Sequence, residues 1–291
     1  MGEMTLREAL EEYQSVYLAA RNYSKKTRAD YGHDVLELVE FLDKAGVKRV
    51  GELGVPVLER YLADLDNRGV AGSTRKKKVV SVRSFLSFLY HNEYIAVNLA
   101  KRIIPPRSEY RNPRFLTEKE YKRLLDVCSH SKRDYAIIQL LLQTGMKLSE
   151  LTRLKIDDLD LADSGGFVRI RGGRGKEDRM LPLNNKACLA LKAYLLQRED
   201  SGNPTLFLNK FGQALGDRGV QKMIRKHIER ARLENASVHT LRHTFGIHQA
   251  VKGTSLETLK EVMGHKDGRS TSLYLSMAKE SVRKEILENA L

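Results

Sequence analysis

Cysteine, tryptophan and proline are scarce in this sequence. Its 291 residues include two cysteines, Cys128 and Cys188, six prolines and no tryptophan. The two cysteines lie far apart and form no CxxC motif, which argues against a disulfide-stapled scaffold and a cysteine-rich zinc module. Such sparse cysteine use fits a reducing cytoplasm, and we expect that location.

Long apolar runs are also missing. The longest, AIIQLLL at residues 136–142, is far too short to span a bilayer. The first residues, MGEMTLREALEEY, are acidic where a secretory signal is basic and then apolar. We therefore expect neither a membrane-spanning segment nor a membrane partner.

Positive charge, by contrast, is abundant. The net charge is +14, with 51 Lys and Arg against 37 Asp and Glu. Residues 1–105 carry 17 basic and 14 acidic side chains, and the remainder carries 34 and 23. A basic excess of this size predicts a polyanionic partner, and nucleic acid fits better than an acidic membrane surface. The second half should meet that partner most strongly.

A proline-rich stretch divides the chain into two domains. Three of the six prolines fall within RIIPPRSEYRNPRF, residues 102–115. Because proline disfavours helix at its own position and just before it, we interpret residues 105–115 as a semi-rigid linker. It separates a domain at residues 1–104 from a second at residues 116–291.

Helical signals fill the first domain. Thr5 and Glu8 have the spacing of a capping box, and Ser24 is placed to cap a second helix. Pro56 suits the first turn of a third helix, and Ser73 is expected to open a fourth. The pattern predicts a small all-helical bundle.

The second domain has a mixed pattern. Thr117 and Glu120 form another capping box at the start of helical periodicity, which Gly145 interrupts. Two short extended pieces, residues 167–171 and 179–183, flank the Gly-rich GGRGKED and predict a β-hairpin. We expect a mainly α protein, in which an α+β domain with a small antiparallel sheet follows the helical domain.

Two groups of cations in the first domain sit at the N-terminal turns of expected helices. Backbone NH groups at such turns also favour phosphate, so we predict contacts to nucleic acid there. The alternative, that these are ordinary solvated charges, stays open. The candidates are Lys25, Lys26, Arg28, Arg75, Lys76, Lys77 and Lys78.

The stretch VHTLRHTFGIH, residues 238–248, concentrates histidine around one arginine. His239 and His243 have the i, i+4 spacing of a zinc pair, but the Glu of an HExxH motif is missing and Arg242 would repel a metal. We therefore expect no metal. His243 and His248 are assigned to ordinary helix packing. His239 and Arg242 share a helix face and suit a tetrahedral oxyanion.

A tyrosine downstream completes a possible nucleophilic site. Gly264 ends a helix, His265 follows it, and Tyr274 lies nine residues further on. A free phenol has a pKa of about 10, so cations around a bound phosphate would favour phenolate and stabilise the charge that develops during attack. This chemistry needs neither a metal nor another cofactor.

These motifs resemble those of the tyrosine recombinases of the lambda-integrase type, and look closest to the Xer-like integrases of prokaryotes. HTLRH, MGH and the following tyrosine keep the family's order and spacing, and TGMKLSEL at residues 144–151 resembles its first catalytic box. GGRGKEDRMLPL resembles its β-hairpin, and residues 17–42 resemble its helical core-binding (SAM-like) domain.

The resemblance implies a site-specific recombinase. Its two domains would clamp duplex DNA, and four protomers would exchange strands through 3′-phosphotyrosyl links and a Holliday junction, without a nucleotide cofactor. Tyr274 would be the nucleophile. Arg242 and His239 would hold the nonbridging oxygens and assist proton transfer, and His265 would hydrogen-bond the phosphate.

Two positions depart from the family pattern. Lys147 stands where the first box normally has arginine, which replaces a bidentate fork with one mobile charge. Arg174 stands where the hairpin normally has its general-acid lysine, and arginine holds its proton too tightly for that role. We favour Lys176 as the acid over Arg174. An exchange of duties between Lys147 and Arg174 is a further alternative, as are ordinary phosphate contacts for all three.

Other functions remain open on the sequence. A type IB topoisomerase would use the same chemistry on one duplex, and a DNA-binding protein on the same scaffold would bind without cutting. A metal hydrolase is the third alternative, and it would lose its activity when a chelator removes the metal. Residues 279–291 have the pattern of an amphipathic helix, which in the family packs into a neighbouring protomer; folding back on its own domain is the alternative.

Overall fold

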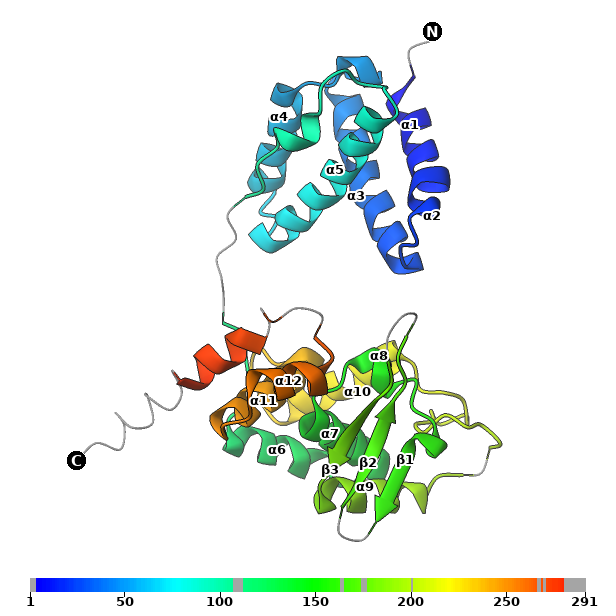
Figure 1. Cartoon of the computed structure of the whole chain (residues 1–291), viewed down its shortest axis with the longest axis vertical. Coiled ribbons are helices and arrows are strands. Elements are labelled where there is room, and N and C mark those ends of the chain that lie inside the picture. Colours follow the sequence, from blue (N-terminus) through cyan, green and yellow to red (C-terminus); the bar gives the residue numbers. More distant parts are fainter. Residues whose placement is uncertain are drawn as a thin grey trace, which may run out of the picture. The chain divides into compact units, whose positions relative to one another are not determined.

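The computed structural model describes residues 4–106, 112–162, 165–173, 177–199, 201–265, 268 and 271–279. It divides into two compact units, Met1–Arg111 and Asn112–Leu291, which we call the helical unit and the C-terminal unit (Figure 1). The dividing line falls inside the proline-rich stretch at residues 105–115. Mainly α architecture with one small sheet is confirmed.

Helices make up the regular structure of the helical unit. The capping box of Thr5 and Glu8 opens the first, and Ser24 accepts a hydrogen bond from the amide of Thr27 at the start of another. One predicted start was wrong by two residues, because Ala71 rather than Ser73 occupies the N-cap of its helix. The helices are α1 (Leu6–Glu12), α2 (Leu18–Ala20), α3 (Lys25–Lys44), α4 (Val55–Asn67) and α5 (Gly72–His91), with a π-helical turn at Tyr13–Tyr17 and 3₁₀ turns at Val50–Glu52 and Leu99–Lys101.

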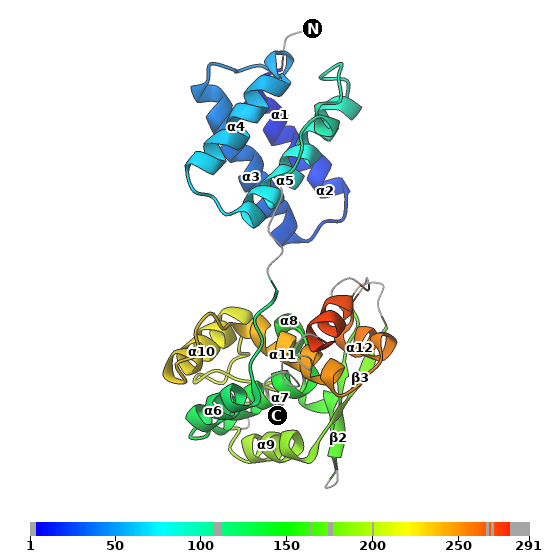
Figure 2. The ribbon, with the colours of Figure 1, turned by 90° about the vertical axis from the view of Figure 1, so that its left-hand side faces the viewer.

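Aromatic side chains fill much of the core of the helical unit. α3 packs along α5, and α1 with the turn that follows it closes one side (Figure 2). The ring of Tyr13 meets Phe85 edge-on, with centroids 5.3 Å apart, and lies 5.5 Å from Phe88. Aromatic pairs in this geometry add stabilisation beyond the area that they bury. The helical periodicity of the sequence therefore corresponds to a real core.

The C-terminal unit places helices against a three-stranded antiparallel sheet. Its strands are β1 (Leu159–Ala162), β2 (Gly165–Ile170) and β3 (Arg179–Leu183), in the order β1-β2-β3. The predicted hairpin is confirmed, with Val168 opposite Leu181. β1 was not predicted, because its four residues give too short a pattern. Alternation buries Val168, Ile170, Leu181 and Leu183 on the helix-facing side.

A helix whose middle is mostly apolar forms the centre of this unit. α7 (Lys132–Thr144) packs against α6, α9 and α11, so its apolar residues are buried on several sides (Figure 2). The other helices are α6 (Glu118–Cys128), α8 (Leu148–Leu151), α9 (Asn185–Leu195), α10 (Asp217–Arg230), α11 (Val238–Val251) and α12 (Leu256–Met263), and residues 271–279 are also helical. Within the described ranges, no helix is both long and apolar enough to cross a membrane.

Gly145 allows the chain to turn sharply after α7. Its φ of 59° is in the left-handed region, and a Cβ there would come within 2.3 Å of the Phe245 ring. Glycine is therefore required both for the turn and for the close approach of α11. The turn delivers Lys147 to the start of α8, and it leaves the carbonyl of Gly145 pointing at α11, where Arg242 reaches it.

Candidate active site

Arg242 lies at the centre of the candidate site. It projects from α11, and its residue is only 9% exposed. One Nη donates to the Gly145 carbonyl at 2.5 Å, and the other donates to the Met263 carbonyl at 2.7 Å. Burial lowers the pKa of Arg242, and the nearby Tyr274 and Glu150 oppose that effect. The guanidinium is thus fixed between the ends of α7 and α12.

A half-buried carboxylate, that of Glu150, links the first box to the hairpin. Both oxygens of Glu150 accept from Arg179, at 3.1 and 2.8 Å, and one also accepts from the amide of Lys147 at 2.8 Å. Burial alone would raise the pKa of Glu150, but these hydrogen bonds and the Arg179 charge bring it below its ordinary value. Glu150 is therefore an anion that orders α8 and β3 around the site.

The C-terminal end of α12 collects the cations of this site. Arg179 donates to the Val262 carbonyl at 2.9 Å, Arg242 donates to that of Met263, and the ammonium of Lys147 reaches that of Gly264 at 3.2 Å. Carbonyls at a helix C-terminus carry partial negative charge and attract cations. Positive side chains from α8, β3 and α11 therefore meet just before His265.

Tyr274 is packed beside this cation cluster. It is 2% exposed, and its hydroxyl lies 3.0 Å from Nδ1 of His243. Its ring rests on Gly246, where a Cβ would come within 2.7 Å of the ring carbons. Burial raises the pKa of Tyr274, and the charge of Arg242 counteracts part of that rise. The hydroxyl is thus protonated and held on α11 in the DNA-free protein.

Two further predicted residues border the tyrosine. His265 lies with its ring centroid 6.0 Å from that of Tyr274, and its Nδ1 is 2.8 Å from the hydroxyl of Thr271. His239 is exposed on the first turn of α11, and its charge helps to lower the pKa of His243. His239 is therefore open to solvent, whereas His265 packs on the ring of Tyr274.

The structure brings together residues that the motifs placed far apart in sequence. Tyr274, Arg242, His265 and Lys147 converge from four segments, with His239 one turn away on α11. Arg174 and Lys176 lie outside the described residues. Among the described residues, no group of three or more His, Cys, Asp or Glu could hold a metal ion.

Sequence reasoning missed three members of the site. His243, assigned to ordinary packing, contacts the Tyr274 hydroxyl, whereas His248 does pack as expected, with Nε2 3.0 Å from the Leu116 carbonyl. Glu150 and Arg179 were passed over as well. Glu150 lies inside the first box, three residues after Lys147, and that capping spacing could have drawn attention to it.

Four of the predicted cations in the helical unit face solvent. Lys25 and Lys26 are exposed on the first turn of α3, and Lys76 and Lys77 are exposed near the start of α5. Arg28 is half-buried, with its Nε donating to the Tyr23 carbonyl at 3.1 Å. Lys25, Lys26, Lys76 and Lys77 remain candidates for phosphate contacts.

Arg75 and Lys78 are engaged within the helical unit. Arg75 pairs with Asp66 at 2.7 Å. Lys78 is buried, with its ammonium 3.0 Å from Asp34 and hydrogen-bonded to Glu37. The prediction that Lys78 contacts nucleic acid was therefore wrong. Its position on the inner face of α5 could not be told from the run of four basic residues alone.

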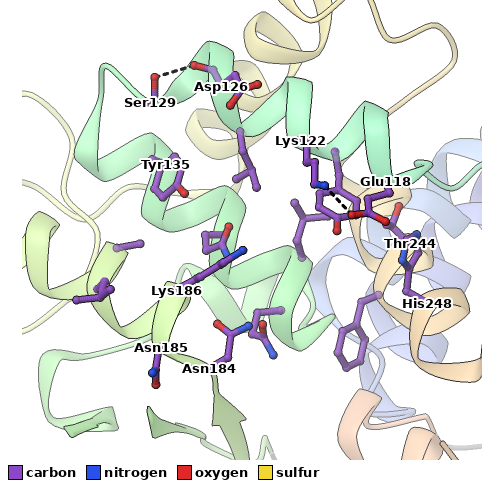
Figure 3. Close-up of a pocket in the computed structure, with 18 of the residues that line it drawn as sticks. Glu118, Lys122, Asp126, Ser129, Tyr135, Asn184, Asn185, Lys186, Thr244 and His248 are labelled. Atoms are coloured by element: carbon purple, nitrogen blue, oxygen red, sulfur yellow. Dashed lines mark hydrogen bonds and ion pairs between the residues drawn. The ribbon is translucent and has the colours of Figure 1, made fainter. Parts of the chain in front are cut away.

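A groove of about 1250 Å³ lies in the C-terminal unit among α6, α7, α9 and α11. Figure 3 shows Glu118 and Lys122 paired at its rim, at 2.7 Å, with Thr244 and His248 on the neighbouring helix. Apolar side chains such as Phe245 also line it. α11 thus contributes Arg242 and His243 to the site, and Thr244, Phe245 and His248 to this groove.

The chain matches known proteins over both units. Residues 114–281 match the Phage integrase family, and residues 10–93 match the Phage integrase N-terminal SAM-like domain. Tyrosine recombinase XerC of Pelotomaculum thermopropionicum is 32% identical, over 92% of this chain and 94% of the relative. The XerC of Bacillus subtilis is 31% identical, over 90% of each chain.

Solved structures share the fold. XerH site-specific recombinase bound to palindromic difH substrate superposes with a TM-score of 0.78 at 23% identity, over 95% of this chain and 83% of that one. A lambda integrase tetramer bound to a Holliday junction gives 0.77 at 18% identity, over 94% and 78%. With a family match over more than half of its length and XerC relatives above 30% identity along nearly all of it, the chain belongs to the phage integrase family.

Proposed function

We propose that the protein is a site-specific DNA recombinase of the tyrosine type. It breaks and rejoins duplex DNA through a 3′-phosphotyrosyl intermediate and a Holliday junction, as its similarity to the XerC recombinases suggests. The observation that carries the proposal is the meeting of Tyr274 with the buried Arg242 and His265 in one unit. The cytoplasm, where a prokaryotic chromosome is accessible, is the corresponding location.

The side chains of the site suit attack on a phosphodiester. The Tyr274 oxygen bonds to phosphorus while the bond to the 5′ oxygen breaks, and the reverse reaction restores the DNA backbone. Arg242, Lys147, His239 and His265 stabilise the charge on the nonbridging oxygens. The energy of the broken bond is kept in the phosphotyrosyl link, so that no nucleotide cofactor is consumed. Because Tyr274 is only 2% exposed in the DNA-free protein, DNA binding must open a path between its hydroxyl and the scissile phosphate.

The leaving 5′ oxygen needs a proton. Lys176 is our candidate donor, with Arg174 as the alternative, because lysine releases a proton far more readily than arginine. Both fall between the end of β2 and the start of β3 in the sequence. Loss of cleavage in Lys176→Ala but not in Arg174→Ala would support this assignment, and full activity of Lys176→Ala would remove it.

Binding of the duplex is assigned to both units. In the helical unit the exposed Lys25, Lys26, Lys76 and Lys77 would contact phosphates near the start of α3 and α5. Each phosphate neutralised should contribute about −0.9 to the slope of log affinity against log salt concentration. Replacing one of these lysines by alanine should flatten that slope, and replacing the internally paired Lys78 should not.

Assembly on DNA is assigned to the tail. Residues 279–291 of one copy would dock in the groove among α6, α7, α9 and α11 of the next, which gives a tetramer of coupled sites around the junction. The groove combines apolar side chains with the Glu118–Lys122 pair, and the tail contains charged residues together with Val282, Ile286 and Leu287. Deleting residues 280–291 should leave cleavage of a single site intact and abolish strand exchange between two sites.

The decisive experiment uses a nicked suicide DNA substrate that traps the covalent intermediate. Wild type should give a protein–DNA adduct on a denaturing gel, and Tyr274→Phe should give none while binding DNA with unchanged affinity. Tyr90→Phe, a change in the helical unit, is the matched control and should form the adduct normally. An adduct with Tyr274→Phe would mean that the nucleophile is misassigned. Binding without any wild-type adduct would mean a DNA-binding protein that does not cut.

A further inference from the structure

His243 is the histidine that contacts the candidate nucleophile directly. Its Nδ1 lies 3.0 Å from the Tyr274 hydroxyl, and the two rings meet edge-to-face with centroids 5.7 Å apart. Since a phenol in this setting is protonated, the hydroxyl donates and Nδ1 accepts. The hydrogen bond therefore runs from the atom that must attack phosphorus to a nitrogen that can take its proton.

We propose that His243 is the general base of the cleavage step and removes the proton of Tyr274. This inference rests on the proposed recombinase function. As the Tyr274 oxygen bonds to phosphorus, its O–H bond breaks and the proton passes to Nδ1 of His243, while the phosphorus–5′-oxygen bond breaks on the opposite side. In rejoining, the protonated imidazole returns the proton to the departing phenol oxygen.

The local structure keeps the imidazole in the state that this role needs. His243 is half-buried, and burial, with the charges of His239 and Arg242, lowers its pKa from the ordinary value of 6.5. The group is therefore neutral at pH 7 and able to accept a proton. Among the described residues, Tyr274 itself contacts the imidazole, and His265 lies against the tyrosine ring.

The helix also positions the tyrosine against this nitrogen. Gly246 lies three residues after His243 on the same face of α11, and the missing Cβ leaves room for the Tyr274 ring. His239 lies one turn before His243, on the exposed end of the helix. One face of α11 thus carries three residues with different roles. His239 is open to the phosphate, His243 contacts the hydroxyl of Tyr274, and Gly246 leaves room for its ring.

The direct test compares single-turnover cleavage of the nicked suicide substrate at saturating protein. His243→Gln should slow formation of the adduct by about 10²-fold or more, because general-base catalysis contributes on that scale. DNA affinity and the thermal midpoint should stay close to those of wild type. His130→Gln, an exposed histidine of the same unit outside the site, is the matched control and should cleave at the wild-type rate.

A substrate with a sulfur in place of the bridging 5′ oxygen separates the base from the acid. A thiolate leaves without a proton, so a variant that lacks only the general acid, such as Lys176→Ala, should recover its rate on this substrate. His243→Gln should stay slow, because the tyrosine proton must still be removed. Recovery of His243→Gln on the sulfur substrate would overturn the proposal, since His243 would then act on the leaving group.

The pH profile of the wild-type protein tests the same idea without a change that could disturb folding. A base with a lowered pKa is protonated only in acid, so the cleavage rate should fall as the pH drops below 6.5, and His243→Gln should lack this decline. Cleavage by His243→Gln at the wild-type rate, with the decline intact, would show that His243 only packs. In that case a Tyr274-dependent adduct would still support the recombinase function, whereas a wild type with no adduct would refute that function itself.

Discussion

The helical unit and the C-terminal unit each contain a group of cations around one buried member, Lys78 in the first and Arg242 in the second, but the positive charge is neutralised differently in the two groups. In the helical unit, Lys78 lies between Asp34 and Glu37, and Arg68 pairs with Glu37 at 2.9 Å. In the C-terminal unit, the hydrogen bonds of Arg242 go to two carbonyl oxygens, and Glu150 is paired with Arg179. Formal charge is balanced in the first cluster and left positive in the second.

This is the difference expected between a structural group of cations and the catalytic group that we propose. A buried cation between carboxylates has its charge satisfied and has little to offer an incoming anion. Carbonyl dipoles hold a guanidinium in place but leave its net charge, which strengthens its attraction for phosphate where water is excluded. The four predictions below disturb one cluster or the other, from the largest expected effect to the smallest.

Removing the central cation of the C-terminal unit should have the largest effect. Arg242→Ala should slow adduct formation on the suicide substrate by about 10³-fold, because the developing phosphoryl charge loses its main donor. Arg242→Lys should recover part of the rate, since one ammonium cannot replace a fork that also holds two carbonyls. Single-turnover kinetics at saturating protein measure both.

The matched change in the helical unit is Arg68→Ala. Arg68 is engaged with Glu37 and Asp64 and lies outside both the site and the predicted DNA contacts, so cleavage should be unchanged. Equal losses in Arg68→Ala and Arg242→Ala would erase the distinction between the two clusters.

Glu150→Gln should slow cleavage by up to about 10²-fold through misplacement of its neighbours. The amide keeps the size of the side chain but loses the charge that holds Arg179 and caps Lys147. Because the site becomes more positive, DNA affinity should stay the same or rise while the rate falls. Binding and single-turnover assays on this one variant measure both quantities. A slower cleavage rate without a loss of DNA affinity indicates that Glu150 positions its neighbours.

The control is Asp43→Asn, which breaks the exposed Arg7–Asp43 pair of the helical unit and should alter neither quantity. If Glu150→Gln lost DNA affinity in step with its rate, the carboxylate would be needed for folding of the unit rather than for placing the cations.

Lys78→Met should reduce the free energy of unfolding of the helical unit by about 2 kcal/mol. The substitution leaves Asp34 without its cation and Glu37 with Arg68 as its remaining partner, so the loss reflects the repulsion of two carboxylates that share too little positive charge. Urea unfolding of the full chain, followed by helical circular dichroism, measures it. Cleavage at saturating protein should be unchanged at a temperature where the variant is folded.

Acid should reduce the difference in the free energy of unfolding between wild type and Lys78→Met. Burial opposes ionisation of Glu37, but its hydrogen bonds with Lys78 and Arg68 bring its pKa below the ordinary value of 4.5. A group whose pKa is lowered on folding stabilises the folded state above its unfolded pKa, and that contribution disappears as pH falls through the folded pKa. Wild type should therefore lose more stability below pH 4.5 than Lys78→Met. Parallel loss in both would mean that Lys78 does not set the ionisation of Glu37.

Local signals predicted much of the fold because they act over a few residues. The capping box of Thr5 and the turn at Gly145 depend on neighbours three or four positions away, and both were found in the sequence. The motifs around Arg242 and Tyr274 were found for a different reason, namely the resemblance of their spacing to a family. That spacing indicated which residues belong to the site, but it did not show which of them contact one another.

Contacts between segments that lie far apart in the chain could not be predicted from the sequence. Lys78 meets Asp34 across 44 positions, and only the packing of α5 on α3 decides that it points inward rather than toward DNA. His243 meets Tyr274 across 31 positions, because Gly246 lets the tyrosine ring approach α11. Neither outcome follows from helical periodicity, which places a residue on a face without saying what covers that face.

Lys147→Arg should have the smallest effect and bears most directly on the family departure. The lysine ammonium donates to the Gly264 carbonyl at 3.2 Å, beside the Arg242 fork, so a cation already occupies this corner of the site. Arginine would keep that charge and add a second donor for the phosphate, and cleavage should stay equal or rise by up to about tenfold. The exposed Lys155→Arg controls for the exchange itself and should change nothing. A large drop in Lys147→Arg alone would mean that the smaller ammonium is required, because a guanidinium could not fit between Glu150, Arg179 and the end of α12. In that case the departure would be an adaptation of this site rather than a weakened copy of the family's arginine.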